Sequence, residues 1–294
     1  MLELISIDVS KGVVDQLYRE GKVYYEAIHD QMAISSLIEG SYVILKANQS
    51  SSAIGVMLDD FIELVRPKDF SYQGVKPRDS QQICAFHSFK SFDLTILEGS
   101  AGTGKTTLAV AYAVEMLFKR GKRIVLSKPT TLVGQKSNAI AAIPGDHREK
   151  LAGYIDSFLG AFHRVMGENY EHHVYEWEEA KRLEFVPLEL TRGRQFDDAI
   201  VIIDEAQNTS PHELLTFISR VSDSSQLIIL GDPLQIDTDS KYKDCGMGAL
   251  VNSESVAESD IASGVKLTAQ YRSGLAELSG SILREMYDEN NLSV

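Results

Sequence analysis

Cysteine is scarce in this chain, and long apolar runs and a basic N-terminus are absent. The two cysteines, Cys84 and Cys245, lie in no metal-ligand spacing, which argues against a disulfide framework and favours a reducing, cytoplasmic location. No apolar run reaches the roughly 20 residues of a membrane-spanning helix, so we expect no membrane partner. The first four residues are acidic rather than basic, which argues against a secretory signal.

Basic residues are also in the minority, with 29 Lys and Arg against 42 Asp and Glu and a formal net charge of −13. This balance argues against a surface coated in positive charge for indiscriminate nucleic-acid binding, although it permits a local basic groove. The densest basic cluster, residues 119–123, is explained most simply as a solvated helix end. The 294 residues, 44% of them apolar, suffice for one large globular domain or two modest ones.

The strongest positive signal is a glycine-rich loop between an apolar strand over 94–97 and an apolar helix over 108–118. The loop reads Gly99-Ser100-Ala101-Gly102-Thr103-Gly104-Lys105-Thr106. This pattern is typical of a P-loop, in which glycines let backbone N–H groups approach phosphate and the helix N-terminus adds partial positive charge. Lys105 is expected to reach the β- and γ-phosphates of a nucleotide, and the Thr106 hydroxyl to bind Mg²⁺. We include Thr107 among the nucleotide-binding residues.

Two later strands end in polar groups that suit nucleotide hydrolysis. The apolar strand 199–203 leads into Asp204 and Glu205, and the strand 227–230 leads into a segment that ends at Gln235. Because open parallel sheets bind ligands at the carboxyl ends of their strands, these side chains are expected beside the P-loop. Asp204 is predicted to hold the Mg²⁺ water shell and Glu205 to polarise the attacking water. Gln235 is predicted to contact both that water and the γ-phosphate.

Weaker candidates each have an ordinary structural explanation of similar weight. Gln82 lies in a helix predicted over 80–90 and capped by Asp79; it either reads the adenine edge with its amide or is solvated. Lys128, Pro129 and Thr130 follow a strand over 123–126 and either face a nucleic-acid backbone or form a polar loop. Arg272 is either an arginine finger or an ordinary arginine at the N-terminal end of a surface helix over 274–287.

Residues 1–75 are predicted to form a small α+β unit of unknown role, which precedes a larger domain over 76–294. The unit is expected to contain two helices and a three-stranded meander, over residues 13–18, 26–38, 42–45, 54–58 and 61–65. It lacks the spaced acidic residues of a metal nuclease. In the larger domain we further predict helices over 147–166 and 170–183, an extended piece over 185–188, a helix opened by Ser210 and Pro211, and a last strand over 265–268.

Four segments resemble, in chain order, motifs I, Ia, II and III of superfamily-one helicases. They are the P-loop, the Lys128-Pro129-Thr130 run, Asp204-Glu205-Ala206-Gln207-Asn208 and Gly231-Asp232-Pro233-Leu234-Gln235. Three more bring the chain closer to the PhoH family of ATPases, namely Pro77-Arg78-Asp79 with Gln82, Pro144-Gly145-Asp146 and Thr191-Arg192-Gly193-Arg194. This resemblance covers about residues 74 to 290.

The resemblance implies a RecA-like α/β core, with a parallel sheet between helices and the strand before Gly231 lying between the other two motif strands. It implies that Lys105 and Thr106 hold phosphate and Mg²⁺, that Asp204 and Glu205 serve metal and water, that Gln235 is the sensor and that Gln82 reads adenine. It also implies ATP hydrolysis coupled to RNA or single-stranded nucleic acid at residues 128–130. The chain is too short for a second motor domain, so Arg272 is expected to act on a neighbouring subunit in a homo-oligomer, for which a hexameric ring is one form.

Two classes of function follow. The leading hypothesis is a nucleic-acid-stimulated ATPase that works as an oligomeric helicase or translocase. The alternative is an ATP-dependent switch or scaffold that moves no strand, which the acidic charge favours. A small-molecule kinase fits less well, because Glu205 and Gln235 suit the activation of water.

Overall fold

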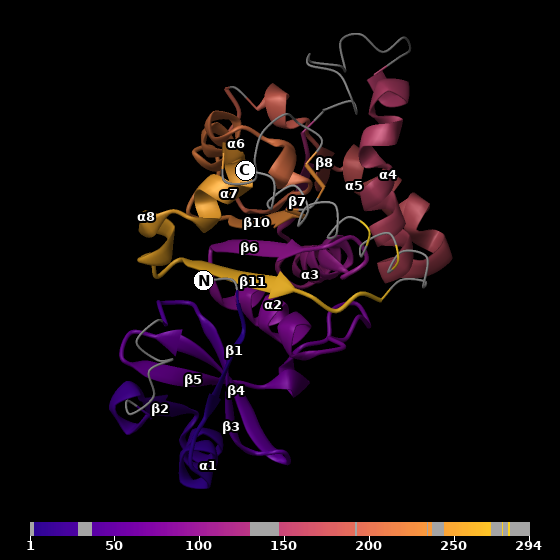
Figure 1. Ribbon diagram of the computed structural model, residues 1–294. Helices are drawn as coiled ribbons and strands as arrows, with labels where there is room; N and C mark the ends of the chain where they lie inside the picture. Colours follow the sequence, from indigo (N-terminus) through magenta and orange to yellow (C-terminus); the bar gives the residue numbers. More distant parts are fainter. Residues whose placement is uncertain are drawn as a thin grey trace.

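The structure is a computed structural model, and it describes residues 3–28, 37–129, 147–191, 193–233, 235–236, 244–271, 278 and 282. Within these residues the strands form two sheets, one of five strands near the N-terminus and one of six strands in the rest of the chain (Figure 1). Among the helices described, none combines the length and the apolar character needed to cross a lipid bilayer.

The larger sheet is parallel throughout and has the strand order β11-β6-β10-β9-β7-β8. Its strands are β6 (Leu94–Gly99), β7 (Arg123–Ser127), β8 (Leu183–Phe185), β9 (Ala199–Ile203), β10 (Gln226–Gly231) and β11 (Ala262–Leu267). This order confirms that β10 lies between the P-loop strand β6 and the acidic strand β9. The carboxyl ends of these three strands therefore meet at one edge of the sheet.

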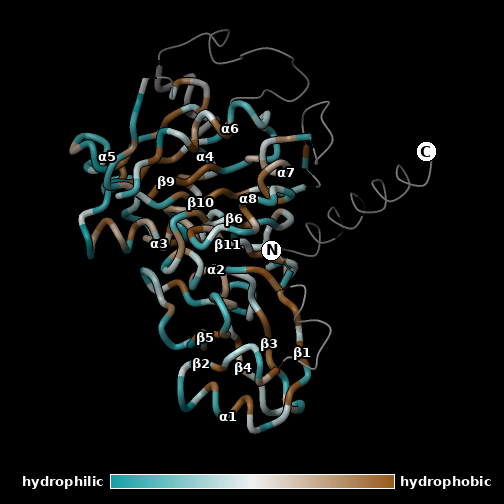
Figure 2. Tube along the Cα trace, turned by 90° about the vertical axis from the view of Figure 1, so that its left-hand side faces the viewer, coloured by the Kyte–Doolittle hydropathy of each residue, from teal (hydrophilic) through white to brown (hydrophobic). Residues whose placement is uncertain are grey.

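Helices cover both faces of this sheet, which explains why its inner strand β9 is apolar and buried at every position. Alternate residues of β9 point to opposite cores: Ile200 and Ile202 join one cluster, and Val201 and Ile203 the other. The first cluster is completed by α2 (Ser80–Ser91), α3 (Lys105–Arg120), α4 (His147–Met166) and α5 (Tyr170–Glu179). The second is completed by α6 (Pro211–Ile218) and α7 (Gly246–Val251), with the short α8 (Glu254–Ala257) beyond them. Figure 2 shows the traces of β9 and β10 in brown in the middle of the larger sheet. The architecture confirms the predicted α/β, RecA-like class.

The N-terminal sheet has the order β1-β3-β4-β5-β2, and its outer strands come from segments for which no strand was predicted. Its elements are β1 (Ile5–Asp8), α1 (Lys11–Glu20), β2 (Lys22–Tyr24), β3 (Tyr42–Asn48), β4 (Ser51–Leu58) and β5 (Phe61–Val65). One face packs on α1, whereas Tyr42, Val56 and Val65 on the other face belong to the core around α2. Figure 1 shows α2 between the two sheets. The division of the chain near residue 75 stays a prediction.

Two predicted elements differ from the structure. The helix predicted over 170–183 ends at Glu179, because Lys181 has a left-handed φ of 55° and Leu183 already pairs with Ile124 in the sheet. The extended piece predicted over 185–188 therefore begins earlier, as β8, and gives way to a 3-10 turn over Leu188–Leu190. For the helix predicted over 26–38, the described part is a 3-10 turn over Tyr25–Ala27 and a non-helical segment after residue 36; residues 29–36 lie outside the described residues.

Candidate nucleotide site

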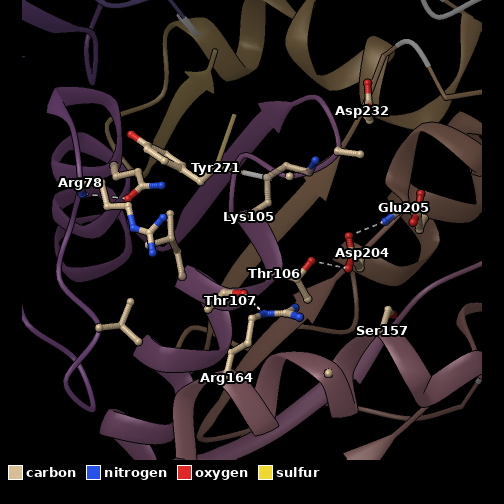
Figure 3. Close-up of a pocket in the computed structure, with 18 of the residues that line it drawn as sticks. Arg78, Lys105, Thr106, Thr107, Ser157, Arg164, Asp204, Glu205, Asp232 and Tyr271 are labelled. Carbon is tan, nitrogen blue, oxygen red and sulfur yellow. Dashed lines mark hydrogen bonds between the residues drawn. The ribbon is translucent and has the colours of Figure 1, made fainter. Parts of the chain in front are cut away.

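A cleft of about 570 Å³ opens at the carboxyl ends of β6, β9 and β10. The P-loop residues 101, 102 and 104–107 line it, together with Asp204, Glu205, Asp232 and Gln235. Figure 3 shows Lys105, Thr106, Asp204 and Glu205 facing one another across this space. The structure therefore brings together the strongest sequence-predicted residues, although they are far apart in the chain.

The P-loop has the backbone that its glycines permit. Gly102 and Gly104 have φ angles of 88° and 94°, which residues with a Cβ rarely adopt. Gly99 packs closely on the last strand, since a Cβ there would lie 2.7 Å from the carbonyl oxygen of Leu267. The Lys105 ammonium lies over the loop and donates to the carbonyl oxygens of Gly99 at 2.5 Å and Ser100 at 3.2 Å. Because α3 begins at Lys105, the positive end of its dipole points at the loop.

Thr106 and Asp204 form the part of the cleft that suits Mg²⁺. The Thr106 hydroxyl donates to Oδ2 of Asp204 at 2.9 Å, and Oδ1 of Asp204 accepts the backbone N–H of Glu205 at 3.0 Å. Asp204 is only 5% exposed. A hydroxyl and a carboxylate are the hard oxygen ligands that Mg²⁺ takes alongside substrate phosphates and water. The residues present therefore fit this ion.

Glu205 occupies an unusual position beside Asp204. Its backbone is left-handed, with φ 58°, so its carboxylate turns back toward the cleft at the end of β9. Burial raises the pKa of this carboxyl above the ordinary glutamate range, and the neighbouring negative charge of Asp204 adds to the increase. A hydrogen bond from Gln207 and the positive charges of Lys105 and Lys128 lower the pKa and oppose that shift. The result is a carboxylate with above-normal affinity for a proton, as a general base needs.

Gln82 is buried and tied to the P-loop, so the alternative of a solvated helix glutamine is wrong. It is 4% exposed; its Nε2 donates to the carbonyl oxygen of Thr103 at 3.0 Å, and its Oε1 accepts from the backbone N–H of Arg78 at 3.0 Å. Asp79 caps α2 as predicted, accepting from the backbone N–H of Gln82 at 2.8 Å. Gln82 also lines the cleft. Its predicted contact with adenine stays a prediction.

Tyr271 and Arg78 form a wall of the cleft, and the sequence analysis assigned neither residue a role. The Arg78 guanidinium lies 4.9 Å from the centre of the Tyr271 ring, and the Tyr271 hydroxyl donates to Asp79. The backbone N–H of Tyr271 donates to the carbonyl oxygen of Gly102 at 3.0 Å, which joins this wall to the P-loop. Arg78 lies in a segment that carries the family resemblance, and this was the available signal for it.

Helix α4 supplies a second unforeseen wall, with Asp156, Ser157, Gly160 and Arg164. Nε of Arg164 donates to the Thr107 hydroxyl at 2.9 Å, as Figure 3 shows. This contact depends on the packing of α4 against α3. No local motif marks it.

The remaining candidates fall partly outside the described residues. Lys128 follows β7 and lies close enough to Glu205 to lower its pKa, and Pro129 after it is buried. Thr130 and Arg272 lie outside the described residues, as do Arg192, Leu234 and the Pro144-Gly145-Asp146 segment.

Comparison with known proteins identifies the family of this chain. The model of the family described as "PhoH-like protein" matches residues 74–278. The chain belongs to the PhoH-like family. A PhoH-like protein of Bacillus subtilis is 41% identical over 152 residues, which cover 51% of this chain and 46% of that protein. Protein PhoH2 of the same organism is 32% identical over 253 residues, 80% of this chain and 54% of its own length. The chain thus spans about half the length of these curated relatives.

Solved structures of low sequence similarity include helicase domains. The Pif1 helicase of Candida albicans matches 67% of this chain and 41% of its own, with 16% identity and a TM-score of 0.34. The Hef helicase domain of Pyrococcus furiosus matches 65% of this chain and 38% of its own, with 14% identity and a TM-score of 0.38. The family membership and the strand order assign the chain to the PhoH-like family and to the P-loop NTPase fold.

Proposed function

We propose that this PhoH-like chain binds ATP with Mg²⁺, hydrolyses it, and couples hydrolysis to binding of RNA or single-stranded nucleic acid. The observation that carries the proposal is the juxtaposition of the Thr106 hydroxyl and Asp204 carboxylate, 2.9 Å apart, with Glu205 as the next residue. A kinase needs no water-activating carboxylate at this place. A hydrolase does.

Each residue has a defined part in the proposed reaction. The P-loop N–H groups and Lys105 bind the phosphates, and Thr106 and Asp204 hold Mg²⁺, which neutralises charge on the transferred group. Glu205 orients the water and accepts its proton as the water oxygen bonds to the γ-phosphorus. The bond from the γ-phosphorus to the bridging oxygen breaks, and ADP leaves with that oxygen. Gln235 contacts the water and the γ-phosphate, and Gln82 reads adenine.

The nucleic-acid surface is proposed at Lys128, Pro129 and Thr130. Lys128 supports this proposal, because it follows β7 and its charge acts on Glu205. A phosphate backbone bound there would change the electrostatic field at the water-activating carboxylate.

We also propose that Arg272 acts on a neighbouring subunit, in a homo-oligomer such as a hexameric ring that serves as helicase or translocase. Sedimentation with ATP tests the oligomer: monomers with full turnover would exclude it.

The test of the function is the ATPase rate with and without single-stranded RNA and DNA, at low and moderate salt. We expect stimulation that weakens as salt rises, because phosphate contacts release counterions. Lys105→Ala is the control for the site and should abolish ATP binding. An ATPase rate that neither RNA nor DNA changes would instead favour the ATP-dependent switch or scaffold, which the net charge of −13 also suits.

A further inference from the structure

Gln207 connects two motifs of the site through one side chain. It lies in the 3-10 turn Ala206–Asn208 and is fully buried. Its Nε2 donates to Oε2 of Glu205 at 2.7 Å and to the backbone carbonyl oxygen of Gln235 at 3.0 Å. Its Oε1 accepts from the backbone N–H of Asp232 at 3.0 Å. One planar amide thus uses both of its N–H groups and its carbonyl within the site.

The local fold places this amide between the two motifs. The left-handed backbone of Glu205 ends β9, and a backbone hydrogen bond from Asn208 to the Glu205 carbonyl, 2.9 Å long, closes the turn that carries Gln207. On the other side, Gly231 permits the close approach. A Cβ there would lie 3.0 Å from Oε1 of Gln207 and would overlap the sulfur of Met247.

We propose that Gln207 is the positioning residue that holds the Glu205 carboxylate and couples it to the loop 231–235. This inference rests on the proposed function, in which Glu205 activates water and Gln235 senses the γ-phosphate. The amide is rigid and is held at three points. A shift of the loop when Gln235 meets a γ-phosphate therefore displaces the donor that orients Glu205. Hydrolysis then depends on the state of the loop.

Gln226 is a second glutamine with a fully hydrogen-bonded side chain, and its amide has a purely structural role. Gln226 begins β10, at the end of the strand away from the cleft. Its Nε2 donates to the carbonyl oxygens of Phe89 at 3.0 Å and Phe92 at 3.2 Å, and its Oε1 accepts from the Tyr112 hydroxyl at 2.6 Å. Like Gln207, it donates two hydrogen bonds and accepts one, but its partners are two backbone carbonyls and a tyrosine hydroxyl outside the site. Gln226→Met is therefore the matched control for Gln207→Met.

The direct test needs no turnover. The carboxyl carbon of Glu205 is titrated by NMR in nucleotide-free protein, with Glu205→Gln used to assign the signal. Gln207→Met should raise the pKa of Glu205 above its wild-type value, because N–H donation favours the ionised carboxylate. Gln226→Met should leave that pKa unchanged. An unchanged pKa in Gln207→Met would overturn the proposal.

The kinetic test separates positioning from stability. Gln207→Met should lower kcat by about 10- to 100-fold, the range of a hydrogen bond to a charged group, with a smaller effect on nucleotide affinity. The low-pH limb of its kcat profile should move to higher pH, and that of Gln226→Met should not. Equal losses of kcat in the two variants, with unmoved profiles, would make Gln207 a structural residue only.

Two further arrangements separate failure of this inference from misfolding and from failure of the proposed function. If Gln207→Met does not fold, Gln207→Leu also removes the donation without adding a charge, and it should raise the pKa of Glu205 in the same way. If wild-type protein hydrolyses no ATP, the proposed function fails, while the NMR titration still decides whether Gln207 governs Glu205.

Discussion

Glu205 is the residue on which the proposed chemistry of the cleft depends. A non-glycine residue with φ 58° is uncommon, and the strained backbone places the carboxylate at the cleft rather than along the strand. Burial and Asp204 both raise its pKa, while Gln207, Lys105 and Lys128 limit the rise. The balance of these effects leaves the pKa of Glu205 above the ordinary glutamate value.

Glu205→Gln should bind ATP normally and hydrolyse it about 10²- to 10⁴-fold more slowly, the usual contribution of a general base. In the wild type the base must be ionised, so kcat should fall as pH drops through the raised pKa of Glu205. The fall should therefore begin at a higher pH than for a solvated glutamate. Rapid-quench hydrolysis and equilibrium nucleotide binding check both statements. They are measured from about pH 4 to about pH 9, a range that covers the ordinary pKa values of carboxyl and imidazole groups.

Misfolding is controlled in the same variant. Because the native pKa of Glu205 is raised, its ionised form destabilises the native state at any pH above the unfolded-state pKa. The neutral amide removes that effect, so Glu205→Gln should unfold at no lower temperature than wild type at neutral pH. Wild-type turnover by this variant would show that another group activates the water.

At the scale of elements, the site depends on how closely β10 approaches its neighbours. Gly231 ends this strand against Met247 of α7 and against Gln207, both fully buried. There its small size, rather than its backbone freedom, is required, because positive φ is not found at this glycine. The glycine in the Gly-Asp-x-x-Gln motif is thus a packing requirement for the contact between the two motifs.

Gly231→Ala should lower the free energy of unfolding by about 1–3 kcal/mol, the usual effect of overpacking a filled core, and should reduce ATPase activity. Denaturant unfolding measures the first effect. The comparison is Gly12→Ala in α1, where the nearest atom to a new Cβ is Oγ of Ser10 at 3.7 Å. That change should stabilise the chain by about 0.4–1 kcal/mol. Equal stability of wild type and Gly231→Ala would mean that Met247 moves aside freely.

Helices and strands with a strong local sequence pattern were predictable, whereas short strands that form only because a neighbouring strand pairs with them were not. The apolar runs of β6, β9 and β10 and the cap of α6 by Ser210 follow from local chemistry; Ser210 and Glu213 form the full capping box. The three- and four-residue strands β1, β2 and β8 exist because a neighbour pairs with them. Within the cleft, Asp204, Glu205 and Gln235 were predictable from motifs, whereas Arg164 and Tyr271 reach it through tertiary packing alone.

At the scale of the whole molecule, the N-terminal sheet and the core of the six-stranded sheet share a buried joint. The Tyr42 hydroxyl and Nδ1 of His87 form a hydrogen bond of 2.9 Å across it, and Oγ of Ser263 donates to the Gly40 carbonyl oxygen at 2.9 Å. A Cβ at Gly40, which also has φ 73°, would lie 2.6 Å from the carbonyl oxygen of Ala262 in β11. The two sheets are therefore expected to unfold together.

His87 makes this joint sensitive to acid. Burial lowers the pKa of His87 to about 4, and the positive charge of Lys90 adds to the decrease. Since the unfolded-state pKa is about 6.5, protonation favours the unfolded chain, and His87 should remove up to about 1.4 kcal/mol of stability per pH unit between those values. Above that window its effect vanishes.

Urea unfolding is followed by the fluorescence of the single tryptophan, Trp177, in the core of the larger sheet, and by far-ultraviolet circular dichroism, which reports both sheets. His87→Phe should be less stable than wild type at neutral pH, since Tyr42 loses its partner, yet show a shallower decline in acid. Parallel pH profiles for the two proteins would place the acid sensitivity elsewhere, and a separate early transition of the N-terminal sheet would show that the joint does not couple the two units.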